Sequence, residues 1–185
     1  MNLDASLDLR RTEQAVAPRS LLRKVLKQAG TILLIIVLAY GVFQFVTHYL
    51  LQSVQVVGAS MSPTLHDSGR YVLNRWIYHV REPQPTDIVV LRDPAEDCYA
   101  VKRIIAKEGD TVQVKNGHLF VNGNLLNEPY LPPDTPTYPG AKAGEQLWVC
   151  GVNQYFVLGD NRNNSADSRV YGTVSRQNIL GMVMP

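Results

Sequence analysis

Cysteine and histidine are scarce in this chain, and neither residue type forms a cluster. Only two cysteines and four histidines occur, and Cys98 and Cys150 stand far apart with no group of histidines beside them. Protein metal sites need several such ligands at close spacing, so we expect neither a metal nor another cofactor. The charge is equally slight, because a net charge of +2 and a pI near 8.5 are too mild for a surface that binds nucleic acid.

A long internal segment lacks charge altogether. No Asp, Glu, Lys or Arg lies between Lys27 and Asp67, and residues 31–51 inside that gap are almost entirely apolar. A helix that crosses a bilayer needs about 20 apolar residues, so this segment is long enough to span a membrane. Residues 1–29 hold six Lys and Arg against three Asp and Glu, and such a basic flank predicts a cytoplasmic N-terminus.

Two other interpretations compete with a membrane anchor. One is a buried core helix, but this segment is apolar on every face and unbroken by charge. The other is a cleaved signal peptide, because Val57-Gly58-Ala59 resembles a cleavage site; the apolar core of a signal peptide is shorter, however, at about 7–15 residues. We therefore expect an uncleaved signal-anchor, with a cytoplasmic basic tail over 1–29, a transmembrane helix over 30–51 and an extracytoplasmic domain over 52–185. Disulfides persist in that compartment, but spacing does not decide whether the two cysteines pair.

Beyond the apolar segment, the pattern changes to short β-type runs separated by turn residues. Asn116-Gly117 suits the positive φ angles of a type I′ turn and predicts a hairpin over 111–121, and Asn122-Gly123 marks a second tight turn. Residues 127–144 are rich in proline and glycine and predict a surface loop. The fold we expect is mostly β, with one N-terminal transmembrane helix followed by an antiparallel, barrel-like β catalytic domain. Further strands are expected over 54–57, 71–73, 87–91, 99–106, 147–150, 155–158 and 179–184.

Ser60 is the serine whose surroundings best suit a nucleophile. Gly58 and Ala59 leave the backbone beside it uncovered, so a substrate main chain is able to approach the hydroxyl. The backbone N–H of Ser60 is also a candidate donor to a developing oxyanion. A lone serine before a turn is more often structural, so the assignment needs a base that removes the hydroxyl proton.

Lys102 is the candidate for that base. A lysine amine with an ordinary pKa of about 10.4 cannot accept a proton at neutral pH, but burial among apolar groups lowers the pKa. In a strand, Lys102 shares its face with Ala100 and Ile104, whereas Arg103 points to the other face. The alternative is an ordinary charge on an edge strand.

A polar block over residues 159–169 is the third unusual feature. Its density of Gly, Asn, Asp and Ser predicts tight turns held by hydrogen bonds from side chains to the backbone. Asp167 and Arg169 are suited to an ion pair that fixes the loop, and the Ser165 hydroxyl is suited to orienting a neutral lysine amine. A polar surface loop without a function is the alternative.

A Ser/His/Asp triad is the main chemical alternative to a Ser/Lys dyad. His66 and Asp67 lie close to Ser60 in the sequence, and His118 lies beside a predicted hairpin turn. Neither histidine has a distinctive context, and His48 falls within the predicted membrane span. The dyad therefore accounts for more of the sequence than the triad does.

Together, these motifs resemble the type I signal peptidase family. Residues 60–65, Ser-Met-Ser-Pro-Thr-Leu, resemble the nucleophile box of that family. Lys102-Arg103, followed by Gly109-Asp110, resembles its general-base box, and residues 159–169 resemble its C-terminal box. The order of the boxes and the preceding apolar segment also fit, so the resemblance covers residues 30–185.

The resemblance implies a membrane-bound serine endopeptidase of the cell membrane that removes signal peptides from exported preproteins through an acyl-enzyme intermediate. It implies that Ser60 is the nucleophile, that Lys102 is the general base and that Ser165 positions the lysine. Asp167 and Arg169 are expected to form a structural ion pair near the site, and the lipid bilayer is an expected partner of what we take to be a monomer. The side chains expected to line apolar substrate pockets are Val54, Val56, Val57, Met61, Leu65 and Val101.

The sequence departs from the pattern of the family in several respects. Some members carry a serine two places before the nucleophile, whose hydroxyl completes the oxyanion hole, and Gly58 stands there in this chain. Asn163 stands where a second aspartate is common. The chain also has one predicted anchor where some members have two, and it lacks their large inserted β domain.

Two functions from other classes are alternatives. A self-cleaving repressor shares the Ser/Lys chemistry, but the 29 residues before the predicted span leave no room for a helical DNA-binding domain. A non-catalytic, membrane-tethered β domain that scaffolds partners fits the predicted fold, and it assigns no role to Ser60.

Overall fold

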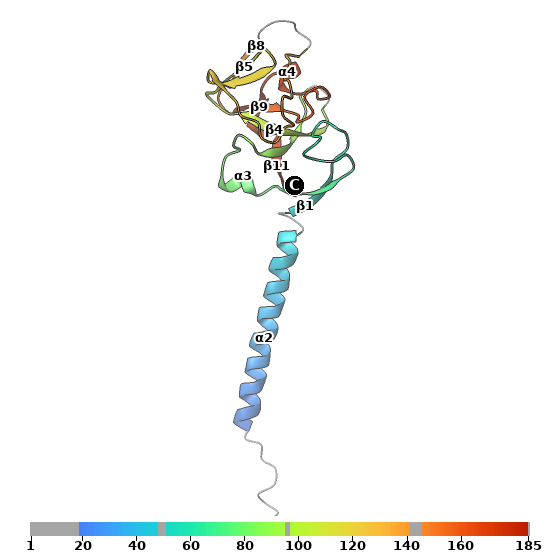
Figure 1. Cartoon of the computed structure of the whole chain (residues 1–185). Coiled ribbons are helices and arrows are strands. Elements are labelled where there is room, and N and C mark those ends of the chain that lie inside the picture. Colours follow the sequence, from blue (N-terminus) through green and yellow to red (C-terminus); the bar gives the residue numbers. More distant parts are fainter. Residues whose placement is uncertain (1–18, 48–50, 95–96, 141–145, 185) are drawn as a thin grey trace, which may run out of the picture. The chain divides into compact units, whose positions relative to one another are not determined.

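The chain forms two compact units, which divide at Val46 (Figure 1). The tail over residues 1–18, His48 of the predicted span and residues 141–144 of the predicted loop lie outside the described residues. The residues that this computed structural model describes are 19–47, 51–94, 97–140 and 146–184.

The first unit is a long helix, α2 (Arg19–Phe45). From Leu21 onward it is long and apolar enough to cross a membrane by length and composition, and none of this stretch is buried inside the protein. The helix begins before the predicted start at residue 30, because the Leu, Arg, Lys and Gln residues that precede it are good helix formers. Helix α2 also ends before the predicted boundary, because Leu51 already opens strand β1 (Leu51–Gln55), where it pairs with Asn74.

The second unit is built from two antiparallel sheets (Figure 1). The larger sheet curls on itself, so the mostly β, antiparallel and barrel-like fold expected from the sequence is confirmed. Its strands, in spatial order, are β1, β2 (Arg70–Asn74), β11 (Ile179–Met184), β3 (Ile88–Arg92), β4 (Tyr99–Ala106), β9 (Gln154–Leu158) and β10 (Val174–Ser175). The strands of the smaller sheet are β7 (Asn124–Leu125), β6 (His118–Val121), β5 (Thr111–Lys115) and β8 (Gln146–Val149).

Most strands lie where the sequence predicts them, and β4 has the predicted bounds. Asn116 and Gly117 take φ angles of 51° and 78° between β5 and β6, as a type I′ hairpin turn requires. The first strand lies earlier than the predicted range 54–57. It ends at Gln55, and the backbone N–H of Val56 donates to the carbonyl of Gly69, which precedes the first residue of β2.

Three short helices connect strands of the larger sheet, and the sequence pattern did not predict them. The helices α3 (Ile77–Val80), α4 (Ser168–Tyr171) and η2 (Arg176–Asn178) have only three or four residues, too few to show a helical period. Helix α4 matters for the site, because Asp167 caps it and accepts a hydrogen bond from the backbone N–H of Arg169.

Two apolar clusters lie next to Ser60 and Lys102. One contains Met61 and Leu65, both fully buried, and supports the segment that carries Ser60. The other contains Val89 and Ile104 and flanks Lys102. These clusters hold the nucleophile candidate and the base candidate on a rigid support.

Candidate active site

Ser60 lies in a tight turn that follows β1. Gly58 has a φ of +104°, which favours glycine, and its N–H donates to Asp67 Oδ1 at 2.7 Å. The N–H of Leu65 donates to the carbonyl of Met61 at 2.9 Å, so these two side chains project together into the core. These contacts anchor the turn to the core, whereas the Ser60 side chain remains half-buried.

The polar block over 159–169 packs directly on this turn. The backbone N–H of Asn161 donates to the carbonyl of Ser60 at 2.9 Å, and its side-chain amide donates to the carbonyl of Ala59 at 3.1 Å. Gly159 lies so close that an added Cβ would come within 2.2 Å of Ser165 Oγ and 2.5 Å of the Ser60 carbonyl oxygen. The Ser165 hydroxyl is buried, and among the described residues it has no hydrogen-bond partner.

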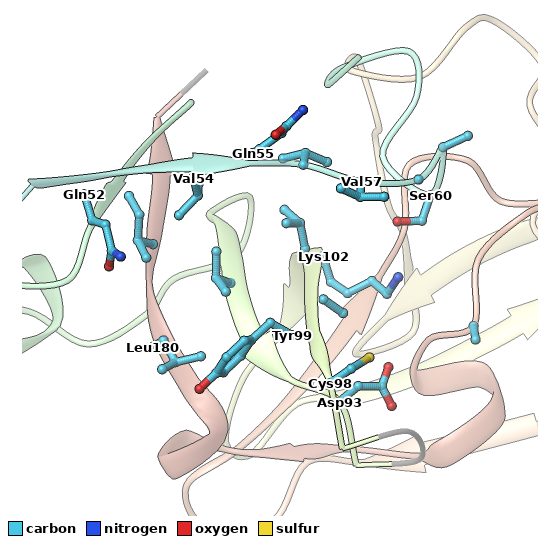
Figure 2. A pocket seen from close by; sticks show the side chains of 18 of the residues that line it. Gln52, Val54, Gln55, Val57, Ser60, Asp93, Cys98, Tyr99, Lys102 and Leu180 are labelled. Atoms are coloured by element: carbon cyan, nitrogen blue, oxygen red, sulfur yellow. The ribbon is translucent and has the colours of Figure 1, made fainter. Parts of the chain in front are cut away.

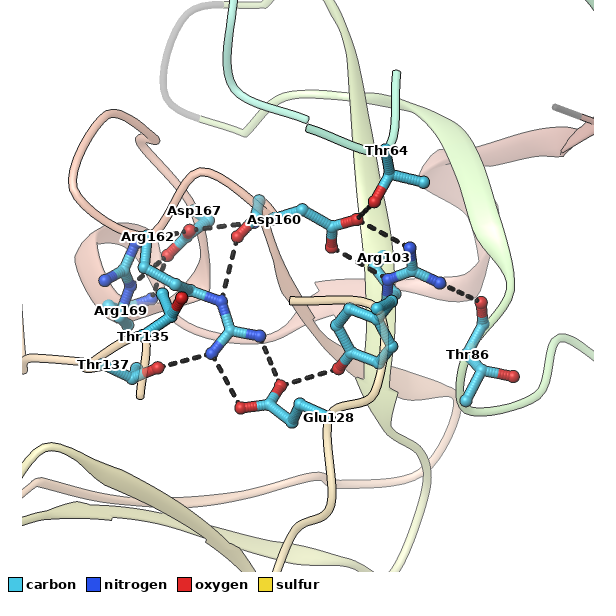
Figure 3. A network of polar contacts seen from close by, with 12 residues as sticks. Thr64, Thr86, Arg103, Glu128, Thr135, Thr137, Asp160, Arg162, Asp167 and Arg169 are labelled. Carbon is cyan, nitrogen blue, oxygen red and sulfur yellow. Dashed lines mark hydrogen bonds and ion pairs between the residues drawn. The ribbon is translucent and has the colours of Figure 1, made fainter. Parts of the chain in front are cut away.

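A buried ion pair joins the lysine strand to both loops (Figure 3). Arg103 donates to the two carboxylate oxygens of Asp160 at 2.8 and 2.6 Å, and both side chains are almost fully buried. Thr64 Oγ1 donates to the same carboxylate at 2.5 Å. This cluster therefore connects the strand of Lys102 with the segment that carries Ser60.

The structure contains the expected ion pair between Asp167 and Arg169 (Figure 3). Two guanidinium nitrogens of Arg169 each donate to one carboxylate oxygen at 2.8 Å, and both side chains are buried. The backbone N–H groups of Gly159 and Arg169 donate to the same carboxylate at 3.0 and 3.2 Å. Asp167 thus holds the two ends of the polar block together.

Lys102 is 4% exposed and lies in an apolar setting. Desolvation is the largest influence on its amine, and it lowers the pKa below the ordinary lysine value. The carboxylates of Asp167 and Asp93 and the thiol of Cys98 oppose this effect, whereas Arg169 acts in the same direction as burial. The net direction is downward, which increases the fraction of neutral amine.

Ser60 and Lys102 line the same pocket, which has a volume of about 840 Å³ (Figure 2). Met61 and Leu65, expected to line it, are fully buried instead, because the turn directs them into the core. Ser165 is absent from its walls in the described structure. The other sequence-predicted residues that line the pocket are Val54, Val56, Val57, Gly58 and Val101.

Asp93 and Cys98 also line this pocket, although no motif in the sequence marks either residue as part of a site. The backbone N–H of Asp93 donates to the carbonyl of Cys98 at 2.8 Å, which extends the β3–β4 ladder beyond its last strand residues. Strand alternation would have placed both on the face of Lys102. Cys98 is exposed and Cys150 is buried, and these two cysteines do not form a disulfide with each other.

Comparison with known proteins gives a consistent result. The family model described as signal peptidase, peptidase S26, matches residues 28–184. Signal peptidase I T of Bacillus subtilis (strain 168) is 36% identical over 157 residues, covering 79% of this chain and 78% of that protein. Signal peptidase I of Leptolyngbya laminosa is 37% identical over 161 residues, covering 82% of this chain and 73% of that protein. A solved signal peptidase I from Enterococcus faecalis V583 has 29% identity and a TM-score of 0.48, and covers 56% of this chain and 98% of that one.

A serine endopeptidase is the class of protein that these findings define. The chain belongs to the signal peptidase family, peptidase S26.

Gly159→Ala should reduce peptidase activity strongly, by roughly 100-fold in kcat/KM, because the added methyl group must displace Ser165 or the Ser60 carbonyl. The matched control is Gly151→Ala, whose Cβ meets only the flexible Gln154 side chain, at 3.0 Å. Equal activity of the two variants would show that the close approach at Gly159 is unimportant.

Asp160→Asn should lower the free energy of unfolding by about 3–5 kcal/mol, because it leaves the Arg103 guanidinium buried without a counter-charge. Urea unfolding measures the effect. Asp97→Asn is the matched control, since it breaks an exposed pair with Arg92 and should leave stability unchanged. A wild-type midpoint for Asp160→Asn would contradict the structural role of the ion pair.

Proposed function

We propose that this protein removes signal peptides from exported preproteins, with Ser60 as the nucleophile and Lys102 as the general base. The observation that carries the proposal is the presence of both side chains in one pocket, with the lysine almost fully buried. Burial favours the neutral amine that a general base must be. The membership of the family supports the substrate class.

In the proposed reaction, the neutral Lys102 amine takes the proton of Ser60 as Oγ attacks the scissile carbonyl. The resulting ammonium then gives this proton to the leaving amine, and water hydrolyses the acyl-enzyme with Lys102 again acting as the base. Among the described residues, the backbone N–H of Ser60 has no acceptor, so it is available to the oxyanion. The N–H of Gly58 is already bonded to Asp67 and does not serve as the second donor.

Ser165 is proposed to position the lysine amine. Its hydroxyl is buried against Gly159, and within the described chain it has no partner, which is costly unless a polar group meets it. A neutral amine offers both a lone pair and N–H donors to that hydroxyl. The ion pair of Asp167 with Arg169 keeps the loop that carries Ser165 in place.

The pocket walls support a preference for small apolar substrate side chains. Val54 and Val57 come from the segment before the nucleophile, and Val101 comes from β4 beside the base candidate. An extended substrate between these walls meets branched apolar side chains on both sides, so a bulky side chain next to the scissile bond would displace the carbonyl from Ser60.

We also propose an N-in, C-out, single-pass topology in a bilayer, with the catalytic unit on the extracytoplasmic side. The excess of Lys and Arg over residues 1–29 and the apolar helix support it. Protease added to spheroplasts should digest the β unit and spare the tail, and the reverse pattern would exclude this topology. One copy of the chain is enough to form the proposed dyad, because Ser60 and Lys102 both come from it.

Ser60→Ala and Lys102→Ala should each abolish cleavage of a preprotein in detergent, measured by mass spectrometry of the cut site. Because the two residues act as one unit, the double variant should be hardly slower than either single variant. Circular dichroism serves as the control for folding. Near-normal activity of either single variant would refute the dyad.

The pH dependence provides a separate check on the base. The reaction needs the neutral amine, so kcat/KM should rise as the pH rises through the lowered pKa of Lys102. We expect the midpoint of this acidic limb at a pH above about 6.5, the pKa that is typical of a histidine base. The exposed His66 and His118 provide the controls, since His66→Gln and His118→Gln should leave the limb in place. Loss of the limb in either variant would assign the base to that histidine.

A further inference from the structure

Asp93 is a buried acid on the wall of the pocket, 5% exposed, and the reaction described above assigns it no role. Val89 lies directly opposite Lys102 in the β3–β4 ladder, so the two side chains share a face of the sheet. Asp93 follows Val89 by four residues, and Cys98 precedes Lys102 by four, so strand alternation places all of them on that face. Figure 2 shows Asp93 and Cys98 together on the pocket wall below Lys102.

We propose that Asp93 is a positioning residue that stabilises the ammonium form of Lys102 when the amine takes the proton of Ser60. The proposal rests on the proposed role of Lys102 as the general base. A cation that forms in a desolvated site is costly unless a fixed negative charge lies nearby. A carboxylate already in place before the reaction provides that charge without reorganisation.

The charged groups around Lys102 come from two sides. Asp167 and Arg169 lie on the polar block, form an ion pair and have opposite effects on the pKa of the amine, because their charges have opposite signs. Asp93, at the end of β3, and Cys98, before β4, both act to raise its pKa. The negative charge of Asp93 therefore acts on the amine from the β3–β4 side of the pocket, separately from the ion pair of the polar block.

Tyr171 is a second buried group on which the charge of Asp93 acts. Its hydroxyl is buried, and among the described residues it has no hydrogen-bond partner. Burial raises the pKa of Tyr171, and the charges of Asp93 and Asp167 raise it further. The two carboxylates thus converge from separate elements on the region that contains Tyr171 and Lys102.

The test is the pH profile of kcat/KM for the full-length Asp93→Asn protein in detergent, with a signal-peptide substrate. Loss of the carboxylate should move the acidic limb to lower pH by about one unit, because the ammonium form loses a stabilising charge. The plateau of kcat should fall by roughly tenfold, the rate equivalent of one pKa unit, with little change in KM. Asp97→Asn is the matched control, because Asp97 is exposed in the same turn and should change neither quantity.

A second variant tests the same charge from the opposite strand. Cys98→Asp adds a carboxylate to the exposed position that faces Asp93, so it should move the acidic limb to higher pH. When Cys98→Asp is combined with Asp93→Asn, the limb should return toward its wild-type pH. An unmoved limb in a folded Asp93→Asn protein, or in Cys98→Asp if the first variant does not fold, would overturn the proposal. Lys102→Ala in the same assay separates the two hypotheses, because activity in that variant would refute the base itself.

Discussion

The buried ion pair between Arg103 and Asp160 is the interaction on which the arrangement of the site depends. Arg103 follows Lys102 directly on β4, and Asp160 precedes Asn161, which holds the carbonyl of Ser60. Three segments far apart in the sequence therefore meet at one carboxylate, because Thr64 bonds to it as well. Burying two charges is costly, but once they are buried in this geometry, neither partner can move without leaving the other unpaired. The pair therefore fixes positions rather than simply adding stability.

Two adjacent cations on one strand meet opposite environments. The Lys102 side chain lies beside buried Val89 and Ile104, and its pKa falls because water is excluded. The Arg103 side chain points to the other face, where Asp160 neutralises it and the ring of Tyr130 lies 3.9 Å from its guanidinium carbon. Arginine keeps its proton under nearly all conditions, so it suits the structural contact, whereas lysine is able to lose its proton and suits chemistry.

The sequence predicted those features that depend on local patterns. The bounds of β4, the Asn116-Gly117 turn and the opposite faces of Lys102 and Arg103 follow from strand alternation and turn chemistry. The inward orientation of Met61 was not predictable, because it depends on how the turn after β1 packs against distant strands.

Other parts of the site depend on contacts across long stretches of chain. The close approach of Gly159 to Ser60 spans about 100 positions in the sequence, so no short window reveals it. Asp93 was not predicted for a different reason. It lies beyond the apolar run that marks β3 in the sequence, and only its backbone hydrogen bond to Cys98 shows that the β3–β4 ladder continues to it.

Strand β1 has a mechanical consequence. It is the first strand after the apolar helix α2, it lies at the edge of the larger sheet, and its five residues all pair with β2. A pull along β1 from its first residue loads this ladder in shear, so its pairs resist together rather than one at a time. The turn that carries Ser60 follows the last of these pairs, so a pull at Leu51 is shared across the whole ladder before it reaches that turn.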